Sequence, residues 1–183
     1  MGAWKGWYHV IGNTYGTWLP GDPRGWRSRH HAEHVEGDYR HPPPDGFYDE
    51  PHESAEARMK RGPVILSPPA RRQAGQAMVE MLLHQKVEVL SFSLDGVHFH
   101  LLGRFGPSRI RPAVGRAKKH AYHILRASGH AGEVWAKRCS IHPIGHRRHQ
   151  VSTYRYVLGH TRVSAWIWAY NQGVYWESTL DFR

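Results

Sequence analysis

The sequence has one cysteine, no long apolar run and few acidic residues, and each shortage excludes a class of protein. Cys139 alone cannot form an internal disulfide, which excludes a disulfide-stabilised secreted domain and fits a reducing cytoplasm. No apolar stretch approaches the roughly 20 residues of a membrane span, and residues 1–6 lack the profile of a signal peptide. We therefore expect a soluble cytoplasmic protein with no membrane partner.

The shortage of acidic residues is confined to one part of the chain. Residues 1–103 hold 11 Lys/Arg and 12 Asp/Glu, whereas residues 104–162 hold 13 Lys/Arg and a single acid, Glu133. A solvated basic face is the simpler explanation, but an asymmetry of this size favours contact with a nucleic-acid backbone. The residues expected to contact DNA are Arg104, Arg109, Arg111, Arg116, Lys118, Lys119, Arg147, Arg148 and Arg155.

Two histidines, His98 and His100, lie one residue apart in an apolar run that is typical of a buried strand. Successive side chains on a strand point to opposite faces, so the two imidazoles share one face and Phe99 points to the other. Two adjacent imidazoles form half of a metal site. Asp95 lies close by, and the Asp95-Gly96 pair predicts a hairpin turn. Because the chain has 16 histidines, the pair is informative only in this setting.

Residues 149–163 are predicted to form a helix that supplies the rest of the site. An apolar stripe is formed at spacings of three and four by Val151, Tyr154 and Leu158. A neighbouring face carries His149, Thr153, Tyr156 and His160. Tyr156 and His160 are four residues apart and point the same way, so the sequence predicts three histidine ligands with a tyrosine beside them. His149 shares this face and is the alternative ligand, and Tyr154 is the alternative tyrosine.

The remaining elements predict an α+β fold. Strands are expected at 7–14, 87–94, 97–105 and 133–144, and helices at 67–85 and 110–127. This order is that of a ferredoxin-like (RRM-like) four-stranded antiparallel sheet with its helices on one face, with the third strand in a central position. The final helix can then cover the histidines on the open face.

We expect a single domain over residues 1–183 with two unusual segments. Residues 16–66 form a long N-terminal insertion in which only 54–61 shows a helical pattern, and its role is left open between disorder and substrate binding. The aromatic tail, 164–183, holds Trp166, Trp168 and Trp176. These rings could stack on unpaired bases, although packing over the sheet is the simpler expectation.

With these parts in place, the chain resembles the single-tyrosine HUH transposases of the insertion-sequence 200 type, most of all the REP-associated tyrosine transposases. The resemblance covers about residues 7–15 and 67–163. It rests on His98-Phe99-His100, on Tyr156-Val157-Leu158-Gly159-His160, and on Trp7-Tyr8-His9-Val10 followed by Thr14-Tyr15-Gly16. This family usually has Asn or Gln where this chain has His160; imidazole is a competent ligand, so the site is retained, and the metal it prefers is left open.

The resemblance implies a bacterial DNA endonuclease and strand transferase that acts on single-stranded or hairpin DNA. His98, His100 and His160 would bind Mg²⁺ or Mn²⁺, which polarises a phosphodiester, and Tyr156 would attack it to form a 5′-phosphotyrosine link. Relatives include monomers and homodimers, so a homodimer remains open. The alternatives are a nucleic-acid-binding protein of this fold without cleavage, and a rolling-circle replication initiator, against which the short chain argues.

Overall fold

The computed structural model of the chain describes residues 4–22, 26–27, 34–35, 46, 48–106, 109–170 and 172–176. It contains two compact units, one formed by Met1–Thr14 with Ile65–Arg183 and the other by Tyr15–Val64. No helix within the described residues is long and apolar enough to cross a membrane.

The larger unit is α+β, with one antiparallel sheet of six strands. Its strands are β1 (Trp7–Thr14), β4 (Glu88–Leu94), β5 (His98–Arg104), β6 (Trp135–Pro143), β7 (Trp166–Ala169) and β8 (Gly173–Trp176). Its helices are α2 (Pro68–His84), α3 (Ile110–Ala127) and α4 (Arg147–Leu158), and the 3₁₀ helix η1 (Gly159–Val163) follows α4. The boundaries predicted for β1 and α3 are confirmed, and those of α2, β4, β5 and β6 shift by one or two residues.

The strand order is β6-β1-β5-β4-β7-β8. The four strands β6-β1-β5-β4 are arranged as the sequence predicts, with β5 in a central position. This order is compatible with a ferredoxin-like fold. The expectation of four strands is wrong, because β7 and β8 extend the sheet beyond β4. No strand was expected in the aromatic tail, residues 164–183. β7 covers the edge of β4, whose unpaired backbone groups would otherwise be exposed.

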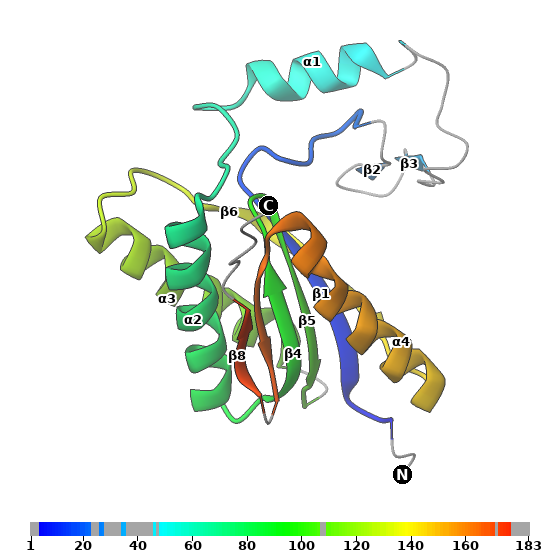
Figure 1. Ribbon diagram of the computed structural model, residues 1–183. Helices are drawn as coiled ribbons and strands as arrows, with labels where there is room; N and C mark the ends of the chain where they lie inside the picture. Colours follow the sequence, from blue (N-terminus) through cyan, green and yellow to red (C-terminus); the bar gives the residue numbers. More distant parts are fainter. Residues whose placement is uncertain are drawn as a thin grey trace, which may run out of the picture. The chain divides into compact units, whose positions relative to one another are not determined.

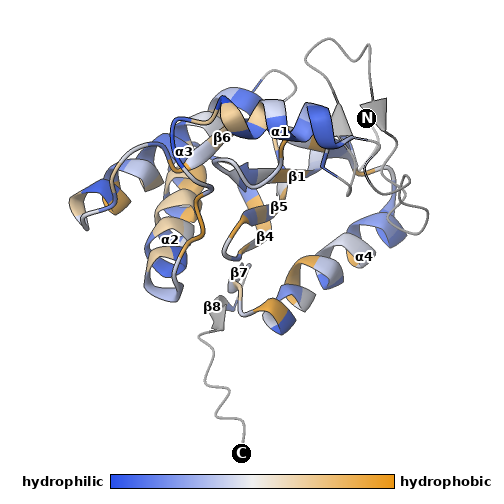
Figure 2. Cartoon of the chain, turned by 90° about the horizontal axis from the view of Figure 1, so that it is seen from above, coloured by the Kyte–Doolittle hydropathy of each residue, from blue (hydrophilic) through white to orange (hydrophobic). Residues whose placement is uncertain are grey.

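The helices lie on both faces of the sheet (Figures 1 and 2): α2 and α3 cover one face and α4 lies over the other. The core between the sheet and α2–α3 contains fully buried Phe92, Phe99 and Leu101. Trp166 is also buried, and a Cβ added at Gly75 of α2 would lie 2.2 Å from its ring. Trp166 therefore packs against α2, which agrees with the simpler expectation for this residue.

The contact face of α4 differs from the prediction. The helix runs from Arg147 to Leu158, and His160 lies in η1 rather than in a continuous helix. The buried side chains of α4 are Gln150, Thr153 and Val157, whereas the predicted stripe of Val151, Tyr154 and Leu158 is half-buried. The sheet face with which α4 packs carries buried polar side chains, among them Ser93 and His100. Polar residues of α4 can therefore be buried there, and an apolar pattern does not mark the contact.

The smaller unit, Tyr15–Val64, contains more structure than the sequence indicated. Helix α1 covers Asp49–Ala57, not 54–61, and the two-residue strands β2 (Trp26–Arg27) and β3 (His34–Val35) pair with each other. Tyr15 joins the two ends of this unit: its carbonyl accepts a hydrogen bond from Val64 N at 2.8 Å, and its hydroxyl accepts one from Lys60 N at 3.0 Å.

Candidate metal centre

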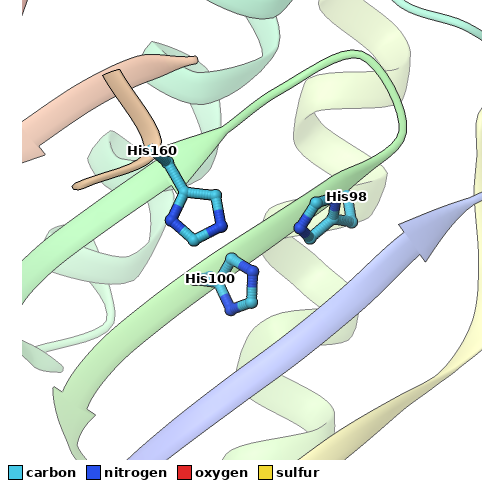
Figure 3. A group of neighbouring side chains, drawn as sticks. All are labelled: His98, His100 and His160. Carbon is cyan, nitrogen blue, oxygen red and sulfur yellow. The ribbon is translucent and has the colours of Figure 1, made fainter. Parts of the chain in front are cut away.

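Three histidines from two separate parts of the fold come together on the α4 side of the sheet. His98 and His100 lie at the start of β5, and His160 lies in η1. Each has a ring nitrogen within 4.8 Å of one in each of the others (Figure 3). These are the three ligands predicted from the sequence, and the structure shows that they could hold a metal ion.

The residue between the two strand histidines fixes their orientation. Phe99 is fully buried on the opposite sheet face, where its ring lies over Gly12, the residue paired with it across β1. A Cβ at Gly12 would lie 2.4 Å from that ring, which is far inside van der Waals contact. Gly12 thus provides the space for Phe99, and the position of Phe99 keeps His98 and His100 on the other face.

All three histidines use Nδ1 for a hydrogen bond within the protein. His98 Nδ1 lies 2.8 Å from Asp95 Oδ2, His160 Nδ1 lies 3.0 Å from the Tyr156 carbonyl oxygen, and His100 Nδ1 lies 3.0 Å from His9 Nε2. An imidazole that donates from Nδ1 presents the lone pair of Nε2. The same tautomer at each position leaves three Nε2 atoms to bind a metal.

The environment of His100 and His160 favours their neutral forms. Burial, followed by the neighbouring histidines His160, His98 and His9, lowers the pKa of His100 to about 2. Burial also lowers the pKa of His160 and, followed by His142, lowers that of His9 to about 4. Neutral imidazole is the form that binds metals. His100 and His160 are therefore ready to bind an ion at neutral pH without losing a proton.

The positions of the nitrogen atoms fit a metal ion. His100 Nε2 is buried and has no hydrogen-bond partner within the described residues, which is costly for a polar atom unless a ligand satisfies it. For three atoms at most 4.8 Å apart, some point lies within about 2.8 Å of all three, whereas a metal–imidazole bond is about 2.1 Å. Side-chain shifts well below 1 Å would close the site.

Tyr156 lies beside this cluster, one helical turn before His160. Its ring centroid is 4.8 Å from that of His160 and 5.1 Å from that of His100, and the residue is 53% exposed. Within the described residues, Tyr156 and not Tyr154 makes ring contacts with His100 and His160. His149 lies at the start of α4, where its Nδ1 accepts a hydrogen bond from Gly145 N at 3.4 Å. The structure thus brings His160, rather than His149, to the strand histidines.

The residues predicted to contact DNA do not form one surface. Arg147, Arg148 and Arg155 are exposed on α4. Arg111, Arg116 and Lys119 belong to α3 on the other side of the sheet, Arg109 immediately precedes that helix, and Arg104 ends β5. Lys118 is a correction: it is buried, its amine donates to the Ala136 carbonyl on β6, and burial lowers its pKa. Its role is to hold α3 against β6.

Sequence reasoning missed two residues that support the cluster. Asp95 was predicted only as a turn residue, but its Oδ1 accepts from the backbone N–H groups of Val97 and His98, and its Oδ2 contacts the His98 ring. The signal was a carboxylate three residues before a candidate ligand. His9 appeared only within the resemblance of the first strand. Its position beside His100 follows from the pairing of Ile11 with His100, which the sequence does not specify.

No protein-family model matches this chain, and no curated protein matches it.

Proposed function

We propose that this protein is a metal-dependent, single-strand DNA endonuclease and strand transferase of the single-tyrosine HUH type, with Tyr156 as its nucleophile. One observation carries the proposal: His98, His100 and His160 each bring a ring nitrogen within 4.8 Å of one in each of the others, and Tyr156 lies beside His100 and His160. A binding protein or a packing tyrosine requires no such combination. The strand order of β6-β1-β5-β4, compatible with a ferredoxin-like fold, supports the same assignment.

His98, His100 and His160 would hold the ion, and Mn²⁺ or Mg²⁺ bound there polarises a phosphodiester and favours ionisation of a nearby phenol. Three imidazoles suit a transition metal better than Mg²⁺, which prefers oxygen ligands. We therefore expect Mn²⁺ to support the reaction at lower concentrations than Mg²⁺.

The chemical step takes place at the exposed edge of α4. The Tyr156 hydroxyl loses its proton to solvent, and its oxygen forms a bond to phosphorus. The bond from phosphorus to the 3′ oxygen breaks, and this oxygen takes up a proton to become a free 3′-hydroxyl. The 5′-phosphotyrosine link conserves the energy of the phosphodiester bond, so a 3′-hydroxyl of another strand can reverse the step without ATP.

The DNA strand would approach over α4. Arg155 is exposed one residue before Tyr156, and Arg147 and Arg148 are exposed in the first turn of the same helix. The exposure of Tyr156 suits a flexible strand whose phosphodiester can be brought against the cluster. These features support single-stranded or hairpin DNA as the substrate, because the backbone of a perfect duplex is held in a fixed geometry.

Formation of a covalent adduct tests the proposal. The protein is incubated with Mn²⁺ and end-labelled single-stranded DNA, and products are separated on a denaturing gel. The label is at the 3′ end of the DNA, because the 5′-phosphotyrosine link retains the fragment on that side of the cut. We expect a labelled protein band with the unmodified chain and with Tyr154→Phe, and none with Tyr156→Phe, while DNA binding persists in all three. DNA binding without an adduct under any metal would instead identify a non-cleaving DNA-binding protein. An adduct lost in Tyr154→Phe but retained in Tyr156→Phe would show that Tyr154, and not Tyr156, is the nucleophile.

A further inference from the structure

A second basic site lies at the other end of β5. Arg104 ends this strand six residues beyond His98, a separation of roughly 20 Å at the rise of an extended chain. Beside it, a cavity of about 450 Å³ lies between the end of α2 and the start of α3. Its charged lining residues are Lys86, Arg104, Arg109 and Arg116.

The cavity has a strong excess of positive charge. Its lining residues, all within the described part of the chain, include three arginines and a lysine but neither Asp nor Glu. The adjacent Glu88 pairs with Arg104 at 3.4 Å and offsets one of the four charges. Cations gathered around a cavity repel one another unless an anion occupies it.

One arginine of the lining is held in place by hydrogen bonds, and part of the cavity wall is apolar. Gln85 accepts a hydrogen bond from Arg116 Nε, and its own amide donates to the Ala113 carbonyl at 3.2 Å, so that this guanidinium is anchored at the junction of α2 and α3. Buried Val87 and Phe105 complete the wall. The volume falls in the range of small-molecule pockets, about 300–1,000 Å³, and an apolar wall beside arginines suits a nucleotide unit with its phosphate better than a bare anion.

We propose that this cavity binds a phosphate group of a nucleic-acid strand, at a site separate from the histidine cluster. Guanidinium groups bind phosphate oxygens in a bidentate manner, which favours arginine over other cations for this purpose. This inference takes its substrate from the proposed function but requires neither the metal nor Tyr156. A strand held here and at the cluster would be fixed at two points along the sheet.

Lys86 offers a variant that removes charge without weakening the fold. It has a φ of 61°, in the left-handed region that favours glycine. Lys86→Gly therefore removes a cation and relieves backbone strain, and we expect its thermal stability to equal or exceed that of the unmodified protein. Arg109→Gln is the second variant, at an exposed position. Lys137→Gln removes an exposed charge on β6, outside the cavity, and is the matched control.

The first measurement is binding of a fluorescein-labelled oligothymidylate, followed by anisotropy over a salt series in EDTA. Loss of one phosphate contact lowers the slope of log affinity against log salt by about 0.7 for a single strand. We expect this decrease, with affinity several-fold lower, in Lys86→Gly and in Arg109→Gln but not in Lys137→Gln. Unchanged slopes in both cavity variants, or an equal decrease in Lys137→Gln, would overturn the proposal.

Inorganic pyrophosphate, added to the same proteins, distinguishes between two occupants of the cavity, a nucleic-acid strand and a free phosphate compound. We expect pyrophosphate to displace the oligothymidylate from the unmodified protein and to raise its melting temperature, with a smaller rise in both cavity variants. If the variants lose the pyrophosphate effect but keep normal oligothymidylate binding, the occupant is a free phosphate compound and the strand is excluded. Because EDTA removes metals, these results are independent of adduct formation: loss of the adduct alone refutes the proposed function and leaves the cavity site standing.

Discussion

Replacing Asp95 by asparagine tests how the metal centre is assembled. The Asp95 carboxylate is buried, accepts hydrogen bonds from Val97 N and His98 N at 2.7 Å each, and lies 2.8 Å from His98 Nδ1. Asparagine keeps one oxygen for the two backbone groups but presents an NH₂ group to the ring. That group donates to Nδ1, so the ring proton moves to Nε2 and the lone pair needed for the metal is lost.

The size of the effect follows from these bonds. Loss of a carboxylate partner behind a ligating histidine costs about 10–100-fold in metal affinity, and the change of tautomer places Asp95→Asn at the upper end of that range. The backbone bonds to the turn become neutral rather than charge-assisted, which lowers the free energy of unfolding of the metal-free protein by about 1–3 kcal/mol. In the native protein, burial favours the protonated form of Asp95, but the hydrogen bonds from His98 and Val97 outweigh it and lower its pKa.

Calorimetric titration with Mn²⁺ measures this loss. The control is Glu88→Gln, which removes an exposed carboxylate from the same sheet at the Arg104 end and is expected to leave Mn²⁺ affinity unchanged. A folded Asp95→Asn protein whose Mn²⁺ affinity is within threefold of that of the unmodified protein would refute the tautomer argument, and with it the assignment of Nε2 as the ligand atom.

Three further outcomes follow from the same site. His160→Gln should retain substantial Mn²⁺-dependent adduct formation, because its amide oxygen can replace the ligand, whereas His160→Ala should lose most of it and His149→Ala little; the reverse order would place the ligand at His149. Gly12→Ala should displace Phe99 and weaken Mn²⁺ binding at least several-fold by calorimetry, and unchanged affinity would show that Phe99 does not position the histidines. His9 and His100 have folded pKa values of about 4 and about 2, below the unfolded value of about 6.5, so the metal-free protein should lose stability as pH falls below 6.5, by up to about 1.4 kcal/mol per pH unit for each fully buried group. Urea unfolding at pH 7 and pH 5 measures this, His9→Gln should reduce the difference, and identical midpoints would contradict it.

The sequence contains enough information for the central hairpin and the three histidines. Asp95-Gly96 specifies the turn and strand alternation places His98 and His100 on one face, both of which depend on local geometry alone. Helical spacing then couples His160 to Tyr156. The position of His9 could not be predicted from the sequence, because its contact with His100 depends on the register between β1 and β5, which are distant in the chain.

Two incorrect expectations have one origin. The buried face of α4 and the burial of Lys118 both involve polar groups that the fold accommodates: Thr153 lies over a polar sheet surface, and the Lys118 amine reaches the Ala136 carbonyl. A hydropathy pattern assigns such residues to solvent, because it contains no information on the polar groups in the interior with which they can form hydrogen bonds. The β7 strand was missed for a related reason, since its pairing with β4 is long-range.

The polar underside of α4 would make attachment of this helix depend on any metal that the histidine cluster holds. Val157 is its only fully buried apolar side chain within the described residues, and burial of one valine stabilises by about 1.5–3 kcal/mol at most. In the sheet under α4, the hydroxyl groups of Ser91 and Ser93 have no hydrogen-bond partner within the described residues. An ion shared between β5 and His160 would join the helix to the sheet. Part of the binding free energy of that ion would then stabilise the position of α4. Scarce metal would then release the helix together with its tyrosine, and the supply of the ion would set how often Tyr156 is held beside the three histidines.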